Sequence, residues 1–103
     1  MKYTEEYITK NADDLNWFDA CKNMDLTKMS DDLFFRFKDN ISWHKISRNK
    51  TITTEFAHKH HKEIGYIAWF KDGFLHKEDG PAVIYPDGDK EWWTNGELVK
   101  MNY

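Results

Sequence analysis

Met29-Ser30-Asp31-Asp32-Leu33-Phe34 is the stretch of sequence that decides the fold, and an aromatic residue, Trp43, follows fourteen positions after its start. The Ser30 hydroxyl is placed to accept a hydrogen bond from the unpaired N–H groups of a first helical turn. The two aspartates after it suit the positive end of a helix dipole. The apolar residues recur on one helical stripe, at Leu33, Phe34, Phe37 and Ile41. The stretch therefore predicts a capped helix over residues 30–40.

The same pattern occurs twice more in the chain. It begins at Tyr3, 26 residues earlier, and at Ile52, 23 residues later, with Thr4 and Thr53 in the place of the capping serine. Such internal similarity is typical of repeat architectures. Apolar patterns that begin at Trp17 and Trp43 indicate a further short helix in each of the first two units. We expect helices near residues 4–15, 17–23, 30–40, 43–48 and 53–63.

After Tyr66 the spacing of apolar residues changes from helical to extended. Three short apolar and aromatic runs are each followed by Asp-Gly or Asn-Gly, at 72–73, 87–88 and 95–96. These dipeptides are strong hairpin signals because glycine accepts the positive φ of a tight turn. Residues 69–77 also align with residues 92–100 at an offset of 23. We therefore predict an antiparallel meander of about four strands.

The length of 103 residues fits a single domain with one core. The predicted fold class is α+β, in one domain over residues 1–103, with a helical part at 1–63 followed by a β part at 64–103. Aromatic residues make up 17% of the chain. We therefore expect a core built more from rings than from aliphatic side chains, with surplus rings left at the surface, where binding sites favour Trp and Tyr.

Both halves of the chain resemble known repeats. Trp69, Gly73, His76 and Asp79-Gly80-Pro81-Ala82 resemble the Asp-Gly-Pro-Ala β-hairpin repeats of phage and giant-virus proteins, which are similar to membrane-occupation-and-recognition-nexus (MORN) repeats. The helical units resemble a helical repeat of the same viral proteomes. The Asp-Gly-Pro-Ala motif occurs once here, so the chain holds about one and a half β repeats. The resemblance implies a viral origin, scaffold or interaction work and, for a short phage protein, an inhibitor of a host protein such as a defence component.

The sequence favours a cytoplasmic location, which would be the host cytoplasm for a viral protein. The first residues, Met1 to Glu6, are polar and acidic and do not resemble a signal peptide. No apolar run is long enough for a membrane helix. Cys21 is the single cysteine, which fits a reducing compartment. Asn49-Lys50-Thr51 matches a glycosylation sequon, which carries no meaning without a secretory signal.

The aromatic strands supply the candidate partner-binding residues. Neighbouring residues of a strand face opposite sides, so rings at 69–70 and at 92–93 lie on both faces of a sheet. One face covers the helices, and rings on the other mark an interaction site unless loops cover them. We choose Phe70, Tyr85 and Trp93 as the contact face. This choice rests on strand parity alone, and its inverse makes Trp69 and Trp92 the contact rings.

Charge is unevenly distributed along the chain, whose net charge is −3. Residues 41–62 carry five Lys or Arg against one acidic residue, and both flanking segments are acidic. Lys45, Arg48 and Lys59 either steer a partner or form a solvated helical face. So small a basic footprint argues against general nucleic-acid affinity. Nucleic-acid binding through the basic residues 44–62 and the aromatic sheet stays open as an alternative.

No set of residues predicts catalysis, a metal site or a cofactor. His58 and His61 are spaced to share a helical face, but no cysteine or carboxylate completes a ligand set. His60 aligns with Phe37 and is expected to pack, and Cys21 lies on an apolar stripe, where a buried thiol acts as a small hydrophobe. We predict a non-enzymatic module that binds a host protein, with homodimerisation through the sheet edge as a further alternative.

Overall fold

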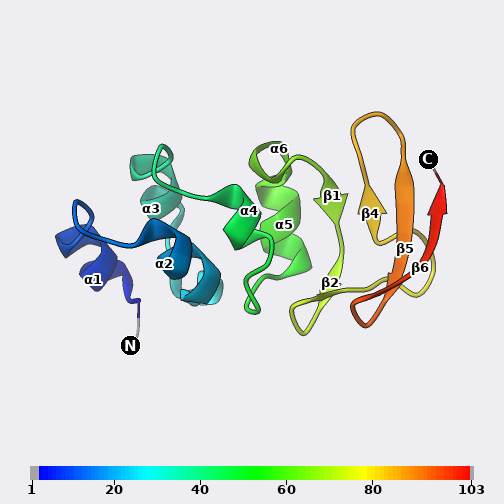
Figure 1. Ribbon diagram of the computed structural model, residues 1–103, viewed down its shortest axis with the longest axis horizontal. Coiled ribbons are helices and arrows are strands. Elements are labelled where there is room, and N and C mark those ends of the chain that lie inside the picture. The colour runs from blue at the N-terminus through cyan, green and yellow to red at the C-terminus, as the bar shows by residue number, and fades with distance from the viewer. Residues whose placement is uncertain (1–2, 103) are drawn as a thin grey trace. The chain divides into compact units, whose positions relative to one another are not determined.

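The α+β fold class is confirmed. In the computed structural model, short helices fill the N-terminal half of the chain and a four-stranded antiparallel sheet lies in the C-terminal half (Figure 1). The structure describes residues 3–102, so Met1, Lys2 and Tyr103 lie outside it, and with them the start of the segment predicted to be polar. The chain divides into two compact units between Thr51 and Ile52. Each unit is described by itself below.

The first unit is built from short helices that begin at side-chain caps. Their bounds are α1 Glu5–Lys10, α2 Trp17–Asn23, the 3-10 helix η1 Leu26–Lys28, α3 Asp31–Arg36 and α4 Trp43–Ile46. The hydroxyls of Thr4 and Ser30 accept hydrogen bonds from the N–H groups of Tyr7 and Leu33. Both predicted caps are therefore confirmed. Asn16 and Ser42 cap α2 and α4 in the same way.

The helices of this unit end earlier than predicted, with the exception of α2. α1 stops at Lys10 and α3 at Arg36, and residues 11–14 and 37–40 form turns. The backbone leaves the helical region at Asn11 and Phe37, where φ is −112° and −109°. The Asn11 side-chain amide also donates to the Tyr7 carbonyl, and local bonds of this kind favour helix ends over helix interiors. α4 likewise ends at Ile46, two residues short of the predicted boundary.

The core of the first unit is aliphatic, so the expectation of a ring-built core is wrong. The largest fully buried apolar side chains of this unit are Ile8, Met24, Leu33 and Ile46. Most of its rings are half-buried or exposed. Trp17 shows the reason, because its indole N–H donates to the Ala12 carbonyl at 3.0 Å. A ring with a polar group stays at the margin of a core, where that group finds a partner.

Asn49 is the buried polar centre of the first unit, with 1% of its surface exposed. Its amide nitrogen donates to the carbonyls of Cys21 and Met24 at 2.9 and 2.8 Å. Its amide oxygen accepts from the N–H and the hydroxyl of Thr51. The two residues that make Asn49-Lys50-Thr51 a sequon therefore bond to each other and tie the end of α2 to the end of the unit.

We expect Asn49→Ala to lower the free energy of unfolding by about 2–4 kcal/mol, because the buried Cys21 carbonyl and the Thr51 N–H lose the Asn49 amide at once. The Met24 carbonyl keeps only its 3.3 Å bond from the Thr51 hydroxyl. Asn23→Ala is the matched control, since the Asn23 amide bonds only within its own helix and is exposed. Urea denaturation of both variants measures the difference. Equal losses in the two variants would show that the buried position of Asn49 is not what matters.

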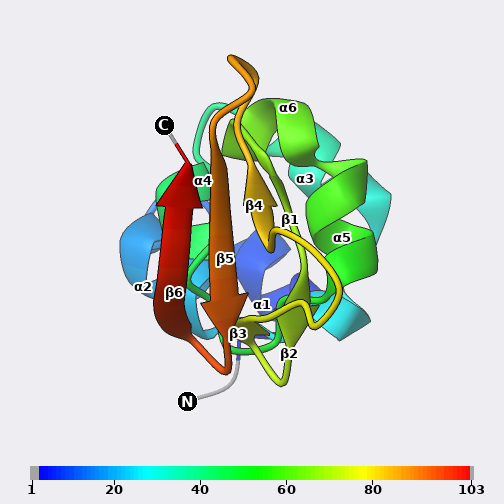
Figure 2. The same cartoon turned by 90° about the vertical axis from the view of Figure 1, so that its right-hand side faces the viewer.

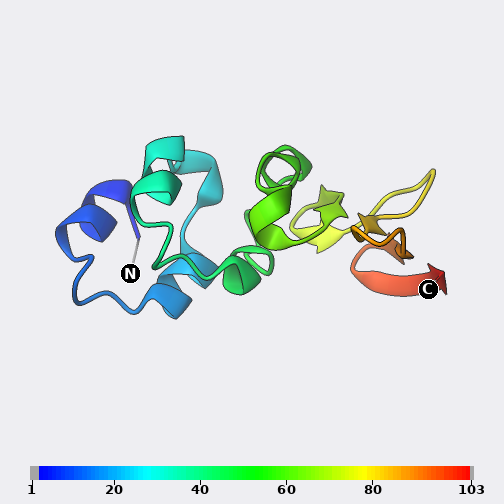
Figure 3. The same ribbon diagram turned by 90° about the horizontal axis from the view of Figure 1, so that it is seen from above.

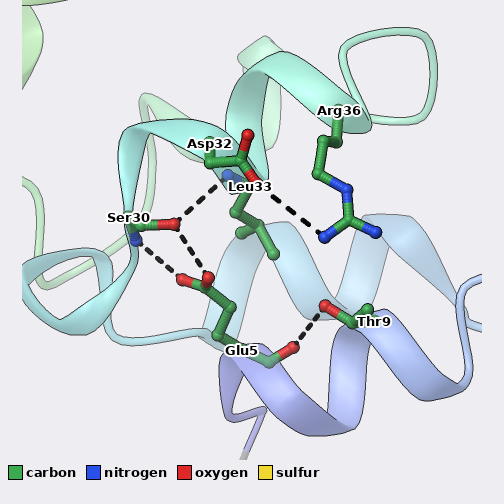
Figure 4. Close-up of polar contacts among 6 residues, drawn as sticks. All are labelled: Glu5, Thr9, Ser30, Asp32, Leu33 and Arg36. Carbon is green, nitrogen blue, oxygen red and sulfur yellow. Dashed lines mark hydrogen bonds and ion pairs between the residues drawn. The ribbon is translucent and has the colours of Figure 1, made fainter.

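Glu5 connects the first turn of α1 to the N-terminal cap of α3 (Figure 4). Its two carboxylate oxygens accept hydrogen bonds from the Ser30 N–H at 2.7 Å and from the Ser30 hydroxyl at 2.8 Å. These bonds favour the charged form and hold the pKa of Glu5 below its ordinary value. The residue that caps α3 is therefore itself held by the helix 25 positions before it.

The depressed pKa of Glu5 makes its stabilising effect depend on pH. The effect is fully present above the pKa of the unfolded state and is lost as the pH falls through the lower pKa of the folded state. We expect Glu5→Gln to lower the free energy of unfolding by about 1 kcal/mol at pH 7. The loss should shrink as the pH falls below about 4.

Glu6→Gln is the control for Glu5→Gln, because Glu6 forms only an exposed ion pair with Lys10 at 3.5 Å. Denaturation curves at neutral and acidic pH test both variants. A loss that is the same at every pH would contradict the assignment of the bond to the charged carboxylate.

The second unit consists of two helices and six strands among its described residues. The bounds are α5 Thr54–Lys59, α6 His61–Ile64, β1 Ile67–Ala68, β2 Phe70–Lys71, β3 Phe74–Leu75, β4 Val83–Ile84, β5 Lys90–Thr94 and β6 Glu97–Asn102. The predicted cap is confirmed, since Thr53 accepts from the Phe56 N–H at 3.1 Å. The helix predicted over residues 53–63 is instead two helices, because His60 leaves the helical region with φ of −107°.

The sheet of the second unit has the order β1-β4-β5-β6, and all of its pairs are antiparallel. Figure 2 shows β6 at one edge and α5 beside β1 at the other, and α5 packs against β1. The predicted set of four antiparallel strands is therefore present. A separate hairpin, β2–β3, is inserted between the first two of them in the chain. Among residues 3–102, no helix combines the length and the apolar character that crossing a bilayer requires.

Two hairpins of this unit, β2–β3 and β5–β6, have matching turns. Asp72 and Gly73 have φ of 52° and 81°, and Asn95 and Gly96 have φ of 48° and 83°. Corresponding residue pairs are Phe70 with Leu75 in one hairpin and Trp93 with Leu98 in the other. The offset of 23 residues seen in the sequence therefore relates both turn conformation and strand register, as the Asp-Gly and Asn-Gly signals predict.

Candidate protein-interaction surface

The five rings chosen from the sequence are all half-buried, and each of these residues forms a side-chain or backbone contact within the second unit. The Lys77 and Lys100 ammonium groups lie 3.9 and 4.7 Å from the ring centres of Trp69 and Trp92. The Trp93 indole donates to Glu91 at 3.0 Å, the backbone of Phe70 bonds to the Thr54 hydroxyl, and the ring centres of Tyr85 and Tyr66 are 5.6 Å apart. These rings are less exposed than strand parity alone suggested.

The three cations chosen from the sequence belong to different units. Lys45 is half-buried on α4, and Arg48 is exposed just after that helix in the first unit. Lys59 is exposed on α5 in the second unit. Lys45 and Arg48 are therefore close in the chain and belong to one unit, and Lys59 belongs to the other.

The histidines are held by the fold. His60 is buried and its ring centre lies 4.5 Å from that of Phe56, so the prediction that it packs is confirmed. The His61 ring nitrogen Nδ1 lies 2.9 Å from the His58 carbonyl, and the His58 ring packs edge-on against Trp69. Within residues 3–102, no three His, Cys, Asp or Glu side chains gather closely enough to hold a metal ion.

Cys21 is fully buried in the first unit, as its position on an apolar stripe predicts. Burial raises the pKa of the Cys21 thiol, and a hydrogen bond from the Ser42 N–H, with the nitrogen 3.5 Å from the sulfur, opposes this only in part. A thiol in this state is a poor nucleophile, because the thiolate is the reactive form.

We expect the Cys21 thiol of the native protein to react with iodoacetamide far more slowly than the same thiol in denaturant. In the folded state the raised pKa of the thiol disfavours the reactive thiolate, and burial blocks access of the reagent to the sulfur. Mass spectrometry of labelled protein over time gives both rates. Native labelling as fast as that of the denatured chain would overturn the structural assignment and reopen a catalytic one.

Strand β6 carries the largest group of exposed apolar side chains on the sheet. Leu98, Val99 and Met101 are 42%, 67% and 55% exposed. They lie on an edge strand whose six residues are all exposed, drawn in red in Figure 3. Together with the half-buried Trp93 they form what we call the β6 surface. Strand parity selected Trp93 but not the other three residues, for which the sequence signal was their place in the last predicted strand.

A β-bulge explains why Leu98 and Met101 share a face. Trp92 pairs with Lys100 and Trp93 pairs with Leu98, so Val99 is the extra residue. In an unbroken strand, residues three apart face opposite sides. Here Met101 pairs with Glu91 and Leu98 with Trp93, and Glu91 and Trp93 are two apart on one strand. The bulge therefore places Leu98 and Met101 on the face of Trp93, whereas Trp92 and Lys100 occupy the other face.

A second concave feature lies on the same unit. Tyr66, Ile67, Ile84, Tyr85 and Pro86 line a cleft of about 460 Å³, together with His61 and Lys62 of α6. Tyr85 and Pro86 also line an adjoining cleft that ends at Asp87 and Asp89. The structure thus separates the five predicted rings, because Trp93 belongs to the β6 surface and Tyr85 belongs to this cleft.

Comparison of the chain with protein-family models, with curated proteins and with solved structures finds no match.

Proposed function

We propose that this chain is a non-enzymatic protein-binding module whose β6 surface takes an extended segment of a partner protein. The observation that carries the proposal is the exposure of Leu98, Val99 and Met101 on an edge strand. Exposed apolar groups on a small protein mark interaction sites when they gather on one surface. An extended segment fits this surface better than a helix does, because an edge strand offers unpaired backbone groups beside its side chains.

The position of Trp93 supports the same surface. Its ring lies on the face that Leu98 and Met101 extend, and its indole N–H is held by Glu91 at 3.0 Å. A ring that is fixed before binding loses little conformational entropy on contact, which is a property of the aromatic residues that dominate interfaces.

The finer proposal concerns the partner. The likeness of Asp79-Gly80-Pro81-Ala82 and of the capped helical units to repeats of phage and giant-virus proteins supports a phage-encoded inhibitor of a host protein, acting in the host cytoplasm. Blocking a host protein requires a stable surface rather than a reaction centre, and the buried thiol and the fold-held histidines suit that role.

We expect Met101→Lys to weaken partner binding at least about tenfold, because a charge replaces an apolar side chain whose burial contributes roughly 1.5–3 kcal/mol. Phe18→Ser is the matched control, since Phe18 is 65% exposed in the first unit and removal of its ring exposes no core. The partner is first captured from host lysate with the wild-type chain and identified. Affinities are then measured with the purified pair.

Three outcomes would contradict the proposal. Light scattering will show whether the chain alone forms a dimer that Met101→Lys dissociates. In that case β6 is the interface between two copies of this chain and not the binding site for a different protein. If the captured material is nucleic acid and its binding falls steeply with salt, the basic segment is the functional one. Equal affinity of Met101→Lys and Phe18→Ser for the purified partner would remove the β6 surface from the interface.

A further inference from the structure

The cleft beside α6 is built around a pair of tyrosines. The register of β1 and β4 sets Ile67 opposite Ile84, so Tyr66 and Tyr85 meet at the end of the pair. Their ring centres are 5.6 Å apart with an angle of 64° between the planes. The aromatic faces and the two isoleucines thus line one side of a space of about 460 Å³, which is within the range of specific ligand sites.

Gly65 allows this arrangement at the end of α6. Its φ of 100° is a conformation that side chains rarely adopt, and it turns the chain from the helix directly into β1. His61 and Lys62, on the last helix, therefore border the same cleft as Tyr66. One end of the cleft is consequently basic.

The other end is acidic. The turn after β4 carries Asp87 and Asp89 into the adjoining cleft, and the Asp87 carboxylate accepts a hydrogen bond from the Asp89 N–H at 3.0 Å. Desolvation and the neighbouring charge of Asp87 raise the pKa of Asp89. Two like charges at this spacing favour a cation beside them. Tyr85 and Pro86 line both clefts, which we together call the groove. His61 and Lys62 line the first cleft, and Asp87 and Asp89 line the second.

We propose that this groove binds a proline-rich segment that carries a basic residue next to its prolines. The middle of the groove offers rings and apolar side chains rather than a sheet edge, so an extended β-segment would lose backbone hydrogen bonds to water there without replacing them. A polyproline II segment has no internal backbone bonds, is already ordered, and stacks proline rings on aromatic side chains. The basic residue lies over Asp87 and Asp89.

This inference deepens the proposed protein-binding function, but it uses a different surface from β6. Tyr66 and Tyr85 lie where β1 pairs with β4, and Leu98 and Met101 lie on the opposite edge strand. The proposal for either surface can therefore be disproved without affecting the other. The groove also explains a polarity that the β6 surface lacks, because its charged ends fix the direction in which the segment runs.

The test uses the full chain and a synthetic polyproline peptide that ends in arginine. Titration calorimetry gives its affinity, and NMR shifts of the wild-type chain locate it at Tyr66, Ile84 and Tyr85. We expect Tyr66→Ala to weaken binding by about tenfold, or ~1.4 kcal/mol. Asp87→Asn should weaken it by roughly threefold, as loss of one exposed charge contact does. Replacing the prolines by glycine and serine should abolish binding.

Two control variants test whether loss of binding is specific to the groove. Asp72→Asn removes an exposed charge from the other hairpin turn, where the equivalent residue is already Asn95 with φ of 48°, so it should leave binding unchanged. Met101→Lys disables the β6 surface and should also leave peptide binding unchanged. Because Tyr66→Ala removes a half-buried ring, Pro86→Ser on the exposed rim serves as a second groove variant and should weaken binding as well.

Four results would overturn the proposal. Equal affinity for the glycine–serine peptide would show a plain charge contact. Shifts that map outside the groove would place the site elsewhere. Equal affinity of wild type, Tyr66→Ala and Pro86→Ser would remove the rings from recognition. Loss of peptide binding in Met101→Lys would show that the peptide needs the β6 surface and that the groove is not a separate site. Loss of binding to the captured partner alone would support two separate surfaces.

Discussion

Hydrogen bonds from side chains to the first turn of each helix are the interaction on which the first unit depends. Its α-helices have four to seven residues, far below the roughly 12–15 that an isolated helix needs in water. In so short a helix the unpaired N–H groups of the first turn are most of the donors. Thr4, Asn16, Ser30 and Ser42 each satisfy one of these groups, and Glu5 in turn fixes Ser30.

Short helices also decide what the core is made of. Each contributes only one or two buried residues, such as Ile8 from α1 and Ile46 from α4, so there is no long stripe on which rings stack. Compact aliphatic side chains fill the small spaces that result. The rings instead lie at margins, where Trp17 and Trp93 find acceptors for their N–H groups. High aromatic content therefore gives a partly covered surface with fixed rings rather than an aromatic core.

Local signals explain which parts of the fold were predictable. A cap such as Ser30 and a turn such as Asn95-Gly96 act within a few residues, so their chemistry is readable from the sequence. The early end of α1 at Lys10 was not predictable from the sequence, because a helical pattern shows which way apolar residues face but not where the helical hydrogen bonds stop. The candidate sites depend on strand pairing. Trp93 lies on a strand, as predicted, but its neighbours Leu98 and Met101 share its face because of a bulge at Val99, which strand parity does not reveal.

Strand register therefore connects the two proposed surfaces. Pairing of β1 with β4 brings Tyr66 to Tyr85 across 19 positions, and the shifted pairing of β5 with β6 brings Leu98 and Met101 to one face. The first surface has rings beside β1, an edge strand against which α5 packs, and the second lies on the edge strand β6 and has only one ring. The two surfaces require different partner segments. The groove requires a polyproline conformation, and the β6 surface requires a segment that can form a strand. One protein with both kinds of segment would engage the sheet at two places, and its overall affinity would then depend on the length of chain between them.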